Sequence, residues 1–115
     1  MAVTGIILVA SGVLLAVVGR LAATGRIKRN EFLGIRTKRS KADDESWRIV
    51  HQRAQPWMHA SGAALLVTGA AVLAIGSDGA VTGLLTLAGV LVCMVFALLG
   101  VAAGHRGLAR RDLPR

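Results

Sequence analysis

The sequence predicts an all-α integral membrane protein, with three transmembrane helices and a short amphipathic helix on the cytoplasmic side. Two observations carry this prediction: three long apolar segments, and a polar insert between the first two. Of the 115 residues 54% are hydrophobic and only 17% are charged. A helix needs roughly 20 apolar residues to cross the hydrocarbon core of a bilayer. The length suits a single membrane domain over residues 1–115.

The first span is expected at about residues 3–23, with Arg20 near its inner end, where a long side chain can reach the interface. Its front end, MAVTG, holds no Lys or Arg, and positive charge follows the apolar run. A secretory signal peptide has the opposite order. We therefore expect this segment to be a retained span.

The other two spans are expected at about residues 57–76 and 80–103. Only Ser77, Asp78 and Gly79 separate them, which predicts a tight helical hairpin. The remaining chain forms a polar insert at about residues 24–56 and a tail at residues 104–115.

Basic residues predict the orientation. Ten of the fourteen Lys and Arg residues lie between Arg20 and Arg53, and the other four lie in the tail. The N-terminus and the turn at 77–79 hold none. Because loops rich in Lys and Arg remain in the cytoplasm, we expect the insert and the C-terminus to be cytoplasmic and the N-terminus to be outside. The sequence therefore predicts a multi-pass protein of the plasma membrane.

A repeated glycine pattern links the first two spans. Residues 4–19 and 61–76 both read hydroxyl-Gly, five apolar residues, hydroxyl-Gly, six apolar residues, Gly. A spacing of seven keeps the glycines on one helix face, and small residues let helices approach closely in lipid. We predict an antiparallel pair packed along Gly5, Gly12, Gly19, Gly62, Gly69 and Gly76. In the third span, Gly100 and Gly104 give a weak dimer signal, which leaves a homo-oligomer open.

The insert contains the amphipathic helix, expected over Glu45–Gln55. Asp43 or Asp44 is placed to cap its N-terminus. Such a helix can lie in the membrane interface with tryptophans at headgroup depth. Pro56 is expected to break or bend the chain before the second span.

Six residues of the insert form a candidate binding or structural motif. The chain is expected to reverse near Gly34, so that residues 30–37 fold back beside the helix. Trp47 and His51 are neighbours on one helix face, as an anchoring tryptophan beside a solvated histidine or as a recognition patch. Arg36 could bind a lipid phosphate, a carboxylate or carbonyls at a helix C-terminus. The motif consists of Asn30, Gly34, Arg36, Thr37, Trp47 and His51.

Composition argues against several function classes. The sequence offers no nucleophile–base pair, no carboxylate pair and no phosphate-cradling loop, so we expect no enzyme and no cofactor. His51 and His59 have no carboxylate nearby, so no metal site is expected. Without a recognition module, the net charge of +8 indicates anionic lipid headgroups as partners instead of nucleic acid.

The insert resembles the SdpI family of small bacterial membrane proteins. That family shows an asparagine, a Gly-Ile-Arg-Thr block, an acidic stretch leading to a tryptophan, and a histidine four residues later. Here the corresponding residues are Asn30, residues 34–37, residues 43–45, Trp47 and His51. The resemblance covers about residues 4–76 and implies a bacterial inner-membrane protein.

The resemblance also implies two kinds of role. The family is named for a larger protein that protects a bacterium from its own secreted peptide toxin and holds a repressor at the membrane. It implies a protective or signalling function for this chain through its cytoplasmic insert. The alternative is an accessory or structural subunit packed in a larger membrane complex. Both predict a protein partner.

Overall fold

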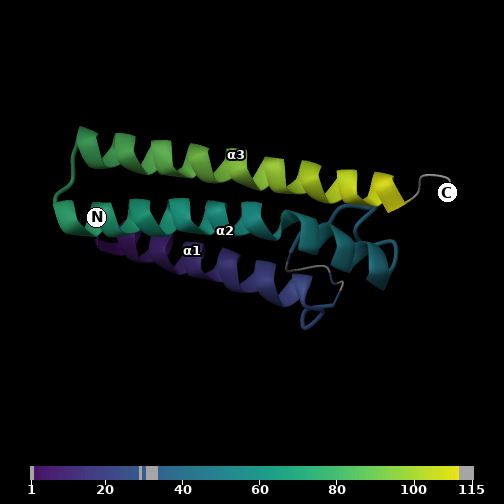
Figure 1. The fold of residues 1–115 in the computed structure, drawn as a ribbon. Helices are drawn as coiled ribbons and strands as arrows, with labels where there is room; N and C mark the ends of the chain where they lie inside the picture. Colours follow the sequence, from purple (N-terminus) through teal and green to yellow (C-terminus); the bar gives the residue numbers. More distant parts are fainter. Residues whose placement is uncertain (1, 29, 31–33, 112–115) are drawn as a thin grey trace.

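The computed structural model describes residues 2–28, 30 and 34–111. It holds three helices, α1 (Ala2–Ala23), α2 (Asp44–Ile75) and α3 (Ala80–Arg111). Figure 1 shows α2 between the other two, and the N-terminus near the end where α2 turns into α3. The elongated bundle measures 57 × 23 × 19 Å. Each helix is long and apolar enough to cross a membrane, which indicates an all-helical, multi-pass membrane protein.

The expected fourth helix does not exist as a separate element in the described chain. Residues 45–55 form the first part of α2, which continues through Pro56. The proline removes one N–H donor from the helix, but Ala54 and Met58 on either side of it are buried against neighbouring helices. At 32 residues α2 is about 48 Å long, well beyond the roughly 30 Å of a hydrocarbon core. Its first turns therefore extend past the apolar segment.

Both ends of α2 have defined caps. Asp43 is the N-cap, and its carboxylate accepts a hydrogen bond of 2.6 Å from the Ser46 backbone N–H. At the other end Gly76 adopts a left-handed conformation with φ of 71°. Gly76 therefore ends the helix and does not pack against α1, which corrects its predicted place in the glycine seam.

The remaining glycines bring α1 and α2 into backbone contact. A Cβ atom added at Gly62 would lie 2.5 Å from the Gly12 carbonyl oxygen, and one added at Gly12 would collide with the Gly62 carbonyl oxygen. A Cβ at Gly69 would lie 2.8 Å from the Gly5 carbonyl oxygen. Gly19 faces Met58, and a Cβ atom added at Gly19 would lie 3.1 Å from the Met58 Cβ atom. The backbones of α1 and α2 can approach this closely only because these positions carry no side chain.

A second seam joins α2 to α3. A Cβ at Gly104 would lie 2.7 Å from Val50, and one at Gly100 would lie 3.0 Å from Trp57. These two glycines, which gave the weak dimer signal in the sequence, thus pack against α2 of the same chain. The Ser61 hydroxyl adds a bond of 3.2 Å to the Cys93 carbonyl oxygen of α3. Helix α3 continues to Arg111, so most of the expected tail is helical, and residues 112–115 lie outside the described chain.

Candidate functional site

His51 is the centre of the site, and its ring is completely buried. Its Nε2 atom accepts a hydrogen bond of 2.8 Å from the Ile35 backbone N–H. Its Nδ1 atom lies 2.7 Å from the Trp47 carbonyl oxygen. Because an amide N–H only donates and a carbonyl only accepts, the ring is neutral with its proton on Nδ1. Nε2 therefore holds the insert, while Nδ1 is occupied by a carbonyl of the ring's own helix.

Burial reinforces this neutral state. His51 lies six residues before Trp57, where the apolar segment of α2 begins, and so lies outside that apolar segment. Burial lowers the pKa of His51 below its ordinary value of 6.5, and this effect exceeds the opposing effect of the hydrogen bond to the Trp47 carbonyl. Protonation of Nε2 would also break the bond from Ile35, because a protonated nitrogen cannot accept.

Trp47 lies beside His51 and is equally enclosed. Its side chain is 2% exposed, and the two ring centroids are 4.3 Å apart. The indole Nε1–H donates a hydrogen bond of 2.9 Å to the Ile27 carbonyl oxygen. The expectation of a solvated histidine is therefore wrong, and neither ring of the expected recognition patch lies on the surface of the chain. The two rings are internal parts that attach the insert to α2.

Gly34 lets the insert approach these rings. Its φ of 94° lies in the region that side chains rarely adopt. A Cβ atom there would lie 2.7 Å from His51 Nε2 and 3.1 Å from the Trp47 ring. Both conformation and space therefore require glycine, and the chain passes directly over the two rings.

The next turn of the insert is closed by Thr37 and Ser40. Ser40 is fully buried, and its hydroxyl donates to the Ile35 carbonyl oxygen at 2.7 Å and accepts from the Thr37 backbone N–H at 2.9 Å. In return the Thr37 hydroxyl oxygen accepts from the Ser40 backbone N–H at 3.1 Å. These bonds satisfy polar groups of a turn in which Ser40 is buried, while Lys38 and Arg39 are exposed.

Thr37 also connects the insert to α3. Its Oγ1 atom lies 2.9 Å from Nε2 of His105, whose Nδ1 atom lies 2.8 Å from the Val101 carbonyl oxygen. In the neutral ring Nδ1 donates to that carbonyl, so Nε2 accepts from the Thr37 hydroxyl. His105 thus has the same arrangement as His51, one turn beyond a backbone carbonyl of its own helix. Neither Ser40 nor His105 was predicted as a site residue.

The remaining contacts reach α1. The Gln52 side chain donates to the Ala23 carbonyl oxygen at 3.2 Å, near the end of α1. Asn30 bonds locally, to the Lys28 carbonyl oxygen at 2.8 Å. Arg36 is exposed. We call the bonded group the latch; it consists of Gly34, Ile35, Thr37, Ser40, Trp47, His51 and His105.

The latch closes one end of a groove of about 650 Å³. Leu14 and Val18 of α1 line one wall, and Ala97 and Val101 of α3 line the other. Met58 of α2 also lines it, and the insert residues at its end include Arg36 and Lys41. An apolar channel with cationic groups at one end suits an amphipathic molecule. Among the described residues no three His, Cys, Asp or Glu side chains gather as a metal site.

Comparison with known proteins gives one match. The profile of the SdpI/YfhL protein family matches residues 26–102, more than half of the chain. The match covers the insert, α2 and most of α3, and so extends beyond the residues that carried the resemblance, while α1 precedes it. Searches of curated proteins and of solved structures found no match. The chain therefore belongs to the SdpI/YfhL protein family.

Proposed function

We propose that this chain is a protective SdpI-type membrane protein whose groove takes a membrane-embedded amphipathic ligand and whose insert responds to it. The observation that carries the proposal is the position of the insert. Gly34 to Thr37 line the groove, and two of them, Ile35 and Thr37, are bonded to His51 of α2 and His105 of α3. A ligand in the groove would therefore touch the membrane helices and the insert together.

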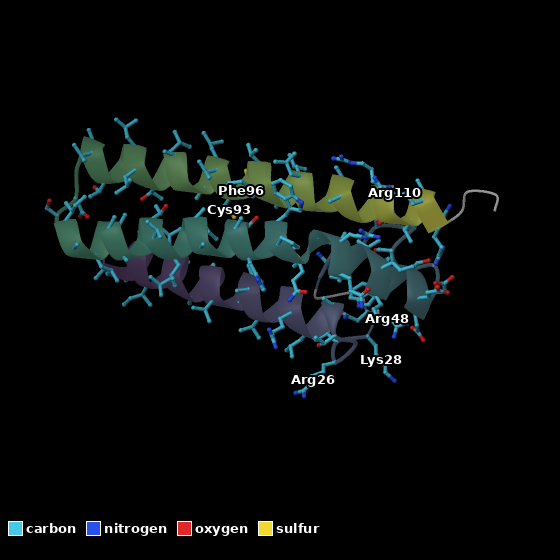
Figure 2. All side chains as sticks on the ribbon, in the orientation of Figure 1. Arg26, Lys28, Arg48, Cys93, Phe96 and Arg110 are labelled. Carbon is cyan, nitrogen blue, oxygen red and sulfur yellow. The ribbon has the colours of Figure 1, made fainter. Side chains whose placement is uncertain are left out.

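The charge distribution supports a cytoplasmic insert in a bacterial inner membrane. Figure 2 shows Arg26, Lys28, Arg48 and Arg110 at the insert end of the bundle, and Cys93 and Phe96 along its apolar middle. In a bacterial membrane this distribution favours an insert in the cytoplasm. A change in the groove would then alter a surface that cytoplasmic proteins can reach, which accounts for a signalling role as well as a protective one.

A binding role fits the chemistry better than an enzymatic one. Each histidine of the latch uses both ring nitrogens in hydrogen bonds, His51 with Trp47 and Ile35, and His105 with Val101 and Thr37. A general base needs a free nitrogen within reach of its substrate. We therefore propose that the histidines position the insert and take no part in a reaction.

A protection assay tests the proposal. Cells that lack their own SdpI-type protein would express this chain and be challenged with the secreted peptide toxin of the family's namesake. We expect wild-type protein to restore growth, and Ala97→Phe, which fills the groove wall, to abolish this effect. Leu98→Phe is the matched control, since Leu98 is 67% exposed on the same helix.

Two results would reject parts of the proposal. Growth no better than with an empty vector would reject the protective role. Equal protection by both phenylalanine variants, at equal protein levels in the membrane, would reject the groove as the site.

The alternative is an accessory subunit of a larger membrane complex. It is favoured by the extensive apolar surface of α3, where Val81 and Leu84 are 70% and 66% exposed. Either lipid or a partner helix would cover such a surface in a membrane. Purification in mild detergent followed by native mass spectrometry distinguishes the two, because a subunit would retain a stoichiometric partner protein.

A further inference from the structure

A second cleft lies between α2 and α3 at the insert end of the bundle. It encloses about 230 Å³ and is lined by Arg53, Ala103, Arg106, Gly107 and Arg110. Three of these five residues carry a guanidinium group, and none of the five is acidic. Among the described residues that line it, such a cleft concentrates positive charge with no carboxylate to offset it.

Helix geometry explains why the three arginines converge. Arg106 and Arg110 are four residues apart on α3 and therefore neighbours on one face. Gly107 lies between them and is buried under Arg53 of α2, since a Cβ atom there would lie 2.7 Å from the Arg53 Cγ atom. The absence of a side chain at position 107 thus lets Arg53 lie across α3. The like charges repel until an anion neutralises them.

A neighbouring cleft at the same end provides a contrast. It encloses about 200 Å³ and includes Lys28 and Arg48, but Asp44 and Glu45 line it as well. Its positive charges therefore face carboxylates supplied by the chain itself. In the arginine cleft the described lining supplies no carboxylate, which suits an anion from outside the protein.

The position of the cleft identifies the kind of anion. The apolar stretch of α3 ends near Ala103, so Arg106 and Arg110 follow it by about one and two turns. On α2, Arg53 lies one turn before Trp57, whose ring packs near Phe96 with the ring centroids 6.3 Å apart. Tryptophans at the ends of apolar segments mark headgroup depth. The three arginines therefore reach the depth of lipid phosphates.

We propose that Arg53, Arg106 and Arg110 bind the phosphate of an anionic membrane lipid. Guanidinium groups match phosphate oxygens in bidentate pairs, and basic pockets between helices at the cytoplasmic face are suited to anionic headgroups. The site is separate from the groove under the latch and does not depend on a protective role. It also holds α2 and α3 together where both leave the membrane.

Lipid competition measured by native mass spectrometry tests this site. The purified full-length protein, in a nonionic detergent, would be mixed with dioleoylphosphatidylglycerol and dioleoylphosphatidylcholine. We expect wild-type protein to prefer phosphatidylglycerol. Arg106→Gln, a change at an exposed position, should lower this preference roughly fivefold, and the triple variant Arg53→Gln, Arg106→Gln, Arg110→Gln should abolish it.

The matched control removes the same charge elsewhere at the same end. Arg26→Gln, Lys28→Gln and Arg48→Gln together should leave most of the preference intact. Equal binding of the two lipids by wild-type protein, equal loss in both triple variants, or an unchanged preference in Arg106→Gln would overturn the site. Displacement of the lipid by inorganic phosphate, or by an acidic peptide, at equal concentration would overturn its assignment to lipid.

Discussion

The middle of the bundle and its insert end are held together by different physical means. In the middle, α1 and α2 touch through glycine backbones, as where Gly12 meets Gly62. At the insert end, buried side chains supply hydrogen bonds, as where His51 accepts from Ile35. In lipid the hydrophobic effect does not drive helices together. Their association therefore depends on close packing. Near water, a polar loop can be buried only if its backbone groups find partners.

The largest effect is expected in the glycine seam. Gly12→Leu should separate α1 from α2, because its Cβ atom would collide with the backbone of Gly62, which cannot move aside as a side chain can. We expect a loss of about 1–3 kcal/mol or more in the free energy of unfolding. The measurement is thermal unfolding in detergent. Gly83→Leu is the control, since a Cβ at Gly83 meets nothing within 4 Å. Equal unfolding temperatures for the two variants would show that the glycine contacts between α1 and α2 do not stabilise the protein.

The next effect is expected at the latch, with Gly34→Ala. The methyl group would strain the backbone, at roughly 1–2 kcal/mol, and would also press on His51 Nε2. Gly25→Ala is a close control, since Gly25 has a φ of 82° but nothing within 4 Å of an added Cβ atom. The difference between the two variants in unfolding free energy isolates the contact with the rings. If Gly25→Ala costs as much as Gly34→Ala, the contact is unimportant.

A smaller effect concerns pH. Because burial lowers the pKa of His51, the unfolded chain binds a proton at a higher pH than the folded protein does. Stability should therefore be complete above about pH 6.5 and decrease as the pH falls below that value. Unfolding midpoints of wild type and His51→Gln, measured from about pH 8 to about pH 5, check this, because that range includes the ordinary pKa of histidine, 6.5. The variant should be less stable at pH 8 and lose less on acidification. Parallel curves would contradict the neutral assignment.

The smallest effect is expected for the connection between the insert and α3. A double-mutant cycle with Thr37→Val and His105→Phe should show a coupling of about 0.5–1.5 kcal/mol, the usual contribution of one hydrogen bond. The free energy of unfolding of the four proteins gives the value. Additive losses would mean that the bond of 2.9 Å does not stabilise the protein.

The sequence was informative where a local pattern determines the structure. Segment hydropathy predicted the three spans, and the glycine spacing pointed to the face of α1 that meets α2. The sequence left open whether Pro56 breaks or bends the chain, and the structure excludes the break, because α2 continues through it. Ser40 was hidden in a cationic run, and Thr37 and His105 are 68 positions apart, so no local pattern joins them. The contacts of the latch are tertiary and follow only from the fold.

The Asn30 and Arg36 side chains illustrate the same limit. They were grouped with Trp47 and His51 because the chain was expected to reverse near Gly34 and to bring residues 30–37 beside the helix. In the structure the group that meets His51 is the backbone N–H of Ile35, beside Arg36. A backbone donor leaves no signature in a sequence, since nearly every residue carries one. Whether Asn30 and Arg36 bind a partner stays a prediction.

Hydrogen exchange of the Ile35 amide tests the latch most directly. In the structure this N–H donates to His51 Nε2 and lies at the end of the groove, where the insert meets the helices. We predict slow exchange in the wild-type protein and exchange at least tenfold faster in His51→Phe, since loss of a bond worth about 1.4 kcal/mol corresponds to a factor of ten. An Ile35 amide that exchanges at the same rate in both proteins would contradict the account, because the insert would then be held by something other than His51.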